Sequence, residues 1–339
     1  MESGNSQLGR NKPNTMKIAI FTNINSPATD FYRTVGCYAY MGHDIRYLAI
    51  ESAKWYDLMD IDVVVAKSPN GMAYFEMLRE CKRMGKKIII DHDDNLHETT
   101  RTNPAHIGLS HEAMRKTVED CFGFADHIIY STDALQKYYM PYHEGIASTV
   151  INNGWNPIIQ PFMPVPKIED KIRFIWRGSM HHLDDIGSIA SYINELAEDE
   201  SCDVAMLGIQ DFIMAHLFPK VKTKEWNSSL FGYFETLNNS QCHYGSFPLL
   251  KNDFNFAKSN IFAIEMLVAG GVTIAPKGIP EYNIPGVIKY ENFGDVMQAV
   301  KNKDFDREAI VKEGREYLND VLRVDKTNKK REVILNNLN

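Results

Sequence analysis

Short apolar runs alternate with amphipathic helical stretches along most of this chain. The runs are rich in Val and Ile, and turn-forming residues follow many of them. Continuous apolar strands of this kind are typical of a parallel sheet that helices cover on both faces. Strands are predicted at 17–23, 44–50, 62–67, 86–91, 126–132, 148–154, 171–179, 203–208 and 272–276. The predicted fold class is therefore α/β, built from two doubly wound, Rossmann-like halves.

The chain length and one Pro-rich interruption predict two domains. A chain of 339 residues is long for a single core, and four prolines fall within 152–166. The predicted division is a disordered tail at 1–15, an N-terminal domain at 16–155, a linker at 156–168, a C-terminal domain at 169–310 and a helical segment at 311–339. Ligands of parallel sheets bind beyond the carboxyl ends of the strands, so two hinged halves predict a site in the cleft between them.

The composition narrows the class of protein. A formal net charge of -7 argues against a protein that coats nucleic acid by charge alone, and the one local basic run, KVKTK at 220–224, is expected to be a solvated loop or helix end. Five widely spaced cysteines without a C-x-x-C pair fit a reducing compartment. No run approaches the ~20 apolar residues of a membrane span, and residues 1–15 lack the apolar core of a signal peptide. We therefore expect a cytoplasmic protein without stable membrane insertion.

The strand at 86–91 runs directly into the cluster Asp91-His92-Asp93-Asp94. Such a cluster could hold a metal, transfer a proton, or bind the backbone amides of the segment that follows. A D-x-D sequence after a strand is also the way in which one class of sugar transferases holds the metal of its nucleotide-sugar. The cluster by itself leaves these alternatives open.

Two stretches of the second half concentrate cations and small polar residues at strand and helix ends. IRFIWRGSMHHLDDI (172–186) places Arg177, Gly178, Ser179, His181 and His182 after a predicted strand. FPLLKNDFNFAKSNIFAIEMLVAGGVTIAP (247–276) places Lys258, Ser259 and Asn260 before a helix that carries Glu265 and ends at Gly270. Two cations and a helix N-terminus are suited to stabilising the negative charge that develops on a diphosphate leaving group.

Together these stretches resemble the retaining GT-B glycosyltransferases, a family with many bacterial and tailed-phage members. In this family the first stretch consists of a strand, Arg or Gly, Gly-Ser, and then His and Asp. The second stretch consists of Pro-Leu, Phe-Asn-x-x-Lys-Ser-Asn, Glu and Gly. ATDFYRTVGCYAYMGHDI (28–45) and INNGW (151–155) resemble its opening helix and its Asn-Gly turn. The resemblance covers roughly residues 16–320 and implies the GT-B fold, in which two Rossmann-like domains face each other across a cleft.

The resemblance implies roles for the residues of both stretches. Arg177 and Lys258 would bind the diphosphate of a nucleotide-sugar, and Glu265 would bind the ribose hydroxyls. Lys258 precedes Glu265 by seven residues. Two helical turns span about 10.5 Å, which suits phosphate at one end and ribose further along. The remaining residues of the nucleotide site would be Gly178, Ser179, His182, Ser259 and Asn260.

For the cluster Asp91–Asp94, the resemblance implies a role other than metal binding. Since the diphosphate would bind in the C-terminal domain, the aspartates need no metal, and no metal site is predicted. Asp93 or Asp94 would line the acceptor pocket or orient the reacting hydroxyl, with a backbone-capping role as the alternative. One departure is Ala257, which stands where many family members carry a second Glu that contacts the donor sugar.

The predicted function is transfer of a sugar from a nucleotide diphosphate sugar, with UDP as the expected nucleotide, to a hydroxyl. The nucleotide-sugar is a co-substrate, and no cofactor is expected. The acceptor could be a hydroxymethylated pyrimidine in phage-type DNA, modified in the host cytoplasm, or a surface polysaccharide or lipid-linked glycan. Ala257 favours a non-catalytic nucleotide-sugar-binding module as a rival, and an epimerase is another. The oligomeric state is not predicted.

Metal independence gives a first testable prediction. If Asp91–Asp94 do not hold a metal, turnover of a nucleotide-sugar should change little when a strong chelator is added. The measurement is nucleotide release with and without chelator. Complete loss of activity that manganese restores would mean that the cluster is a metal site after all.

Overall fold

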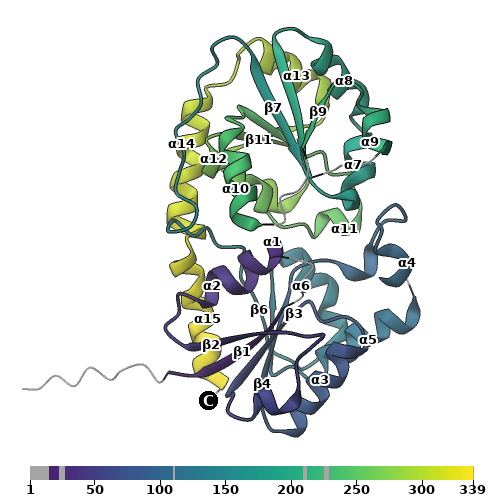
Figure 1. The fold of residues 1–339 in the computed structure, drawn as a ribbon, viewed down its shortest axis with the longest axis vertical. Helices are drawn as coiled ribbons and strands as arrows, with labels where there is room; N and C mark the ends of the chain where they lie inside the picture. The colour runs from purple at the N-terminus through teal and green to yellow at the C-terminus, as the bar shows by residue number, and fades with distance from the viewer. Residues whose placement is uncertain (1–14, 23–26, 110, 209–211, 225–228, 339) are drawn as a thin grey trace, which may run out of the picture.

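The protein contains two six-stranded parallel sheets, one in each half of the chain (Figure 1). The computed structural model describes residues 15–22, 27–109, 111–208, 212–224 and 229–338, so nearly all of the tail predicted at 1–15 lies outside the described residues. Residues 156–168 connect the halves without a helix or strand. Within the described part of the chain, no helix is both long and apolar enough to cross a membrane.

The first sheet has the strand order β2-β1-β3-β4-β5-β6. Its strands are β1 (Lys17–Thr22), β2 (Asp44–Ala49), β3 (Val63–Lys67), β4 (Lys87–His92), β5 (His127–Tyr130) and β6 (Ser148–Val150). The central strands read as unbroken apolar runs because helices cover both of their faces; Ile20, Val65 and Ile89, for example, are fully buried. Each of these strands overlaps one that the sequence predicts.

Helices and short turns of helix surround the first sheet. They are α1 (Pro27–Asp30), η1 (Phe31–Val35), α2 (Gly36–Tyr38), η2 (Trp55–Leu58), α3 (Met72–Arg83), η3 (Leu96–Glu98), α4 (His106–Leu109), α5 (Glu112–Phe122), α6 (Asp133–Tyr139) and η4 (Met140–Tyr142). The element η1 is a π-helical turn, and α1, η1 and α2 together form the opening helix. This irregular helix lies at the cleft, between the two sheets (Figure 1).

The second sheet has the order β12-β11-β10-β7-β8-β9, the arrangement of a dinucleotide-binding fold. Its strands are β7 (Ile172–Arg177), β8 (Cys202–Leu207), β9 (Lys222–Lys224), β10 (Tyr244–Ser246), β11 (Val272–Pro276) and β12 (Val287–Tyr290). Three of them, β9, β10 and β12, are absent from the sequence prediction. KVKTK at 220–224 was expected as a loop or helix end, but its last three residues form the exposed edge strand β9.

The helices of the second half are also mostly short. They are η5 (Met180–His182), α7 (Leu183–Gly187), α8 (Ala190–Glu198), α9 (Phe212–Leu217), α10 (Leu230–Asn239), α11 (Asp253–Phe256), α12 (Ile261–Ala269), η6 (Pro280–Tyr282), α13 (Phe293–Lys301), α14 (Arg307–Tyr317), η7 (Leu318–Leu322) and α15 (Val324–Leu338). Helix α12 is buried all round and ends at Gly270, whose φ of 87° suits a residue without a side chain.

The C-terminal helices connect the two halves a second time. Helix α14 lies beside the second sheet and α15 runs along the first (Figure 1). Val324, Ile334 and Leu335 of α15 pack into the same apolar cluster as Ile18 and Ile20 of β1. The segment after 311 is therefore helical throughout its described part, with one break at Arg323.

A fully buried ion pair fixes the opening helix to the first sheet. Arg33 of η1 places its Nε 2.7 Å from Oδ1 of Asp91 in β4, and neither side chain is exposed. The Arg33 guanidinium also donates to the carbonyl of Ile151 at 2.6 Å and to the side chain of Asn153 at 3.2 Å. One side chain thus connects η1, β4 and the end of the first domain.

Replacing this arginine should destabilise the N-terminal half. Arg33→Ala leaves the Asp91 carboxylate buried without a charged partner, which costs about 3–5 kcal/mol in typical proteins. Thermal and urea unfolding should both show the loss. Lys17→Ala is the control, since its pair with Asp60 is exposed on both sides and its loss should change unfolding little. Equal effects of the two substitutions would contradict the structural role of Arg33.

Candidate active site

The candidate site lies where the strand order of the second sheet reverses. That switch point falls between β7 and β10, and Arg177 is the last residue of β7 while Phe247 directly follows β10. A cavity of about 130 Å³ is found there, and residues of both domains line it. Asp93 and Asp94 come from the first domain, whereas Arg177, Lys258 and Glu265 come from the second.

Arg177 and Glu265 form the buried centre of the site. The Arg177 Nη2 lies 2.6 Å from Oε2 of Glu265, and the guanidinium stacks over the ring of Phe262 at 4.8 Å. Tyr233 donates its hydroxyl to Oε2 of Glu265, and Tyr32 of the first domain donates to Oε1 at 3.0 Å. Burial raises the pKa of the Glu265 carboxyl, while Arg177 and the two phenols oppose that rise. Both carboxylate oxygens are thus engaged within the protein.

A second ion pair crosses the cleft. Lys258, just before α12, places its Nζ 2.9 Å and 3.1 Å from the two carboxylate oxygens of Asp94 in the first domain. The ammonium also lies 4.0 Å from the centre of the Phe254 ring. The pair is partly exposed, with 16% of the Lys258 side chain and 32% of the Asp94 side chain accessible. An anionic ligand can therefore reach Lys258, but it has to compete with Asp94.

The four residues Asp91 to Asp94 have four different environments. Asp91 is paired with Arg33 inside the first domain. His92 is buried among the rings of Phe122, Tyr130 and Tyr139, and burial lowers its pKa to about 3. Asp93 binds Ser68 and Lys67, and Asp94 binds Lys258. Among the described residues no group of three or more His, Cys, Asp or Glu is placed to hold a metal.

The loop after β7 contributes one residue to the cavity. His182 lines it, and its Nδ1 lies 2.8 Å from Oδ2 of Asp185. The other Asp185 oxygen accepts hydrogen bonds from the amide of Leu250 at 2.9 Å and from the side chain of Asn255 at 2.7 Å, which fixes the carboxylate. Gly178 is needed for packing, because a Cβ there would lie 2.5 Å from the Trp176 ring.

The N-terminus of α12 is partly buried. Ser259 lines the cavity, and its carbonyl accepts a hydrogen bond from the hydroxyl of Tyr282 at 3.2 Å. Asn260 is 1% exposed, and its Oδ1 has no hydrogen-bond partner in the described residues. Ala257 is buried with the apolar cluster of the first domain, and its carbonyl accepts from the Thr132 hydroxyl at 3.2 Å. Position 257 therefore belongs to the contact between the two domains.

The structure brings most of the predicted site residues together. Those that line the cavity are Asp93, Asp94, Arg177, His182, Lys258, Ser259 and Glu265. Gly178, Ser179 and Asn260 lie next to these residues without lining it, and the Ser179 hydroxyl contacts His181 at 3.1 Å. The sequence gives no site role to Tyr233, Phe247 or Tyr282, which also line it. No local pattern distinguishes these aromatic residues from ordinary core.

The cavity is smaller than a nucleotide-sugar requires. Ligand pockets of proteins usually enclose about 300–1,000 Å³, whereas this one encloses about 130 Å³. Contacts that join the two domains include Tyr32 with Glu265, Asp94 with Lys258, and the Asn152 side chain with Glu281 at 3.1 Å. Of these residues, Glu265, Asp94 and Lys258 line the cavity.

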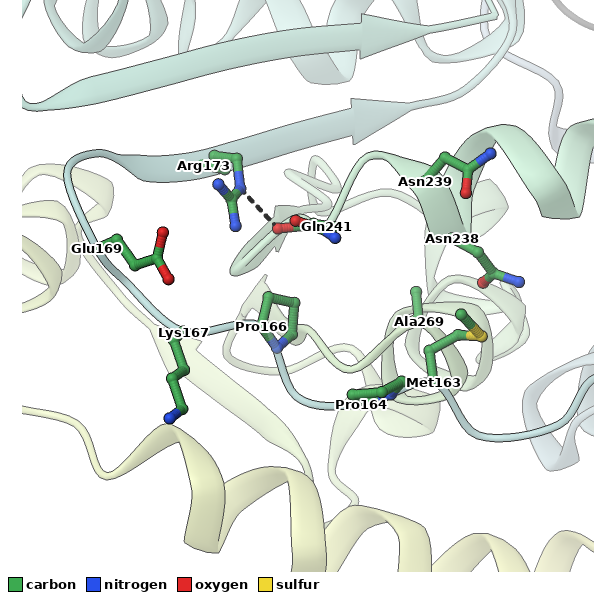
Figure 2. A pocket seen from close by; sticks show the side chains of 10 residues that line it. All are labelled: Met163, Pro164, Pro166, Lys167, Glu169, Arg173, Asn238, Asn239, Gln241 and Ala269. Carbon is green, nitrogen blue, oxygen red and sulfur yellow. Dashed lines mark hydrogen bonds between the residues drawn. The ribbon is translucent and has the colours of Figure 1, made fainter.

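A second hollow of about 360 Å³ lies near the start of β7, away from the carboxyl ends of the strands. Figure 2 shows that its side chains do not converge: Lys167 points away from the hollow on one side, while Asn238 and Asn239 point away on the other. Arg173 is engaged by the carbonyl of Gln241 at 2.8 Å. The cavity between the domains is therefore the better candidate.

Solved structures share this fold over nearly the whole chain, although no family model and no curated protein matches the sequence. Sucrose-phosphate synthase from Thermosynechococcus elongatus matches with a TM-score of 0.67 and 13% identity, over 95% of this chain and 99% of that chain. An α-glucosyltransferase in complex with UDP and a 13-mer DNA containing an HMU base matches with a TM-score of 0.66 and 10% identity, over 95% and 99%. HepE of Anabaena, in complex with UDP and glucose, matches with a TM-score of 0.63 and 11% identity, also over 95% and 99%.

The fold is that of the GT-B glycosyltransferases, as the sequence resemblance predicts. At sequence identities of 10–13%, the similarity shows a shared fold and does not show a shared reaction; the chemistry depends on the residues of the site.

The ion pair across the cleft generates a prediction about nucleotide affinity. If Lys258 binds a diphosphate, Asp94→Asn removes its competitor, and the affinity for UDP should rise by roughly fivefold or less, since a partly exposed pair is worth about 1 kcal/mol at most. Isothermal titration with UDP measures this change. Asp93→Asn is the control, because it leaves the Lys258–Asp94 pair in place and should not tighten UDP binding. Weaker UDP binding in Asp94→Asn would place this carboxylate at the nucleotide itself.

Proposed function

We propose that the protein is a glycosyltransferase that moves a sugar from a UDP-sugar to an acceptor hydroxyl. The observation that carries the proposal is the pair of cations, Arg177 and Lys258, at one cavity beyond the carboxyl ends of the second sheet. The fold adds support, because proteins with the same fold were solved with UDP. In this proposal His182, Ser259 and Glu265 belong to the donor half of the site, next to Gly178, Ser179 and Asn260.

The proposed reaction keeps the configuration of the sugar. The bond between the anomeric carbon and the diphosphate oxygen breaks, a bond to the acceptor oxygen forms on the same face, and the acceptor proton passes to the departing phosphate oxygen. Arg177 and Lys258 stabilise the negative charge on the diphosphate as it leaves. Asp93 and Asp94 lie on the acceptor half and orient the reacting hydroxyl. No residue of this proposal requires a metal.

For the acceptor we propose a hydroxymethylated pyrimidine in phage-type DNA, modified in the cytoplasm of a host cell. The support is one protein of the same fold that was solved with UDP and DNA containing an HMU base. The net charge of -7 weighs against this acceptor, so any contact with DNA has to be local. A surface polysaccharide or lipid-linked glycan is the alternative acceptor.

A donor and acceptor screen tests this function. The protein is incubated with a panel of UDP-sugars, first alone and then with a duplex that contains hydroxymethylcytosine or hydroxymethyluracil. The expected result is release of UDP and a gain of one sugar mass per modified base. UDP release that only a glycan stimulates would move the acceptor to the alternative class. Binding of UDP-sugars without any release would favour a binding module, and an isomerised nucleotide-sugar would favour an epimerase.

The two cations give the sharpest prediction from this proposal. Arg177→Ala and Lys258→Ala should each lower turnover on the order of a hundredfold or more, because each removes a charge contact to the leaving group. UDP release from the best donor measures this effect. Lys277→Ala is the control, since that lysine is exposed on the surface and paired with Glu291. Unchanged turnover in both site variants would remove the basis of the proposed function.

A further inference from the structure

Another largely buried cation, Lys67, lies at the carboxyl end of β3 in the first domain. Its side chain is 9% exposed. The ammonium donates to the Thr29 hydroxyl at 2.9 Å and lies 3.4 Å from a carboxylate oxygen of Asp30 and 3.4 Å from one of Asp93. Thr29 and Asp93 line the cavity between the domains. Lys67 therefore contacts two residues that line the cavity without lining it itself.

The residue after Lys67 holds the same carboxylate from its other side. Ser68 has a φ of 39°, a left-handed conformation that is uncommon for a residue with a side chain. In this conformation its hydroxyl donates to Oδ1 of Asp93, and the amide of Asp93 donates to the Ser68 Oγ at 3.1 Å. Lys67 faces the other oxygen, Oδ2. Both oxygens of Asp93 are thus held by consecutive residues, the last of β3 and the one that follows it.

The electrostatics of this cluster depend on Lys67. Burial opposes the charged forms of both groups, yet their mutual attraction raises the pKa of Lys67 and lowers the pKa of Asp93. The charged or titratable groups that face Asp93 include Lys67 from β3, Arg33 from η1, Tyr74 from α3 and the adjacent His92. Asp30 shares Lys67 with Asp93, so one cation separates two carboxylates.

We propose that Lys67 is a positioning residue of the acceptor half, which holds Asp93 as an ionised and oriented carboxylate against the acceptor hydroxyl. This inference rests on the proposed function. Asp93 accepts a hydrogen bond from the acceptor O–H and aligns its oxygen with the anomeric carbon. The proton itself leaves with the departing phosphate oxygen, so Asp93 ends the reaction ionised. A carboxylate that is fixed at both oxygens keeps this alignment without rotating.

Loss of Lys67 should raise the pKa of Asp93. In Lys67→Met, Asp30 and Asp93 remain buried without the cation between them, and burial then favours the protonated form. The pKa of Asp93, which Lys67 keeps below its ordinary value, should rise. Activity that needs the ionised form should therefore fall off on the acid side at a higher pH than in the wild type.

The test follows UDP release from the best UDP-sugar, with water as the acceptor, across the acidic and neutral range. We expect Lys67→Met to lower turnover on the order of tenfold. The acid limb of the pH profile, where activity falls as the pH is lowered, should move upward by about one pH unit or more. Lys67→Arg keeps the charge and should return the acid limb most of the way to its wild-type pH. UDP affinity, measured by titration, should stay within about twofold, as Lys67 contacts residues of the first domain only. Lys116→Met, at an exposed lysine paired with Asp120, is the matched control.

A second variant keeps the inference testable if Lys67→Met does not fold. Ser68→Ala removes the other donor to Asp93 and should move the acid limb in the same direction by a smaller amount. If activity falls off at the wild-type pH in a folded Lys67→Met protein that binds and releases UDP normally, the role of Lys67 is overturned while the proposed function stands. If Lys67→Met does not fold, the same result in Ser68→Ala overturns the dependence of the acid limb on ionised Asp93, and with it the role of Lys67. A wild-type protein that neither binds UDP nor releases it from any UDP-sugar would overturn the proposed function, and this inference with it.

Discussion

Charge compensation in the cavity and the core beside it determines how this structure is arranged. Four cations each face a carboxylate: Arg33 with Asp91 inside the first domain, and, at or next to the cavity, Lys67 with Asp93, Lys258 with Asp94 and Arg177 with Glu265. Removing an ion from water without a partner costs several kcal/mol, so each buried charge of the site requires its counterpart nearby. An anionic ligand that binds in the cleft has to replace the carboxylates that are already paired with the cations there.

One of these ion pairs, together with several hydrogen bonds and apolar contacts, couples the two domains. Tyr32 of the first domain binds Glu265 of the second, and Gln160 of the connecting segment donates to the Tyr32 hydroxyl at 2.7 Å. Lys258 and Asp94 form the other connection, and α15 packs the end of the chain against the first sheet. Movement of the domains apart would therefore separate Lys258 from Asp94 and Tyr32 from Glu265, whereas Arg177 and Glu265 belong to the same domain and would stay paired.

Much of the fold could be predicted from local sequence patterns. The apolar strands β1, β3, β4 and β11 are continuous runs of Val, Ile and Ala, and helix α12 ends at the glycine where it is expected to end. Of the missed strands, β12 reads Val-Ile-Lys-Tyr and is rich in strand-forming residues, but β9 and β10 have no such pattern. β9 reads Lys-Thr-Lys and β10 reads Tyr-Gly-Ser, so each becomes a strand through its neighbours in the sheet rather than through its own residues.

By itself, the sequence determined the α/β class, the two halves, and the placement of Arg177, Lys258 and the Asp91–Asp94 cluster at the ends of elements, because these follow from local periodicity and chain breaks. Only the tertiary structure decided which charge meets which. Asp91, Asp93 and Asp94 look alike in sequence, yet they face Arg33, Lys67 and Lys258 in turn, while His92 between them faces an aromatic cluster. Tyr32 meets Glu265 across 233 positions of the chain. Such pairings depend on which strands become neighbours and how two domains close, and neither is encoded within a short stretch of sequence.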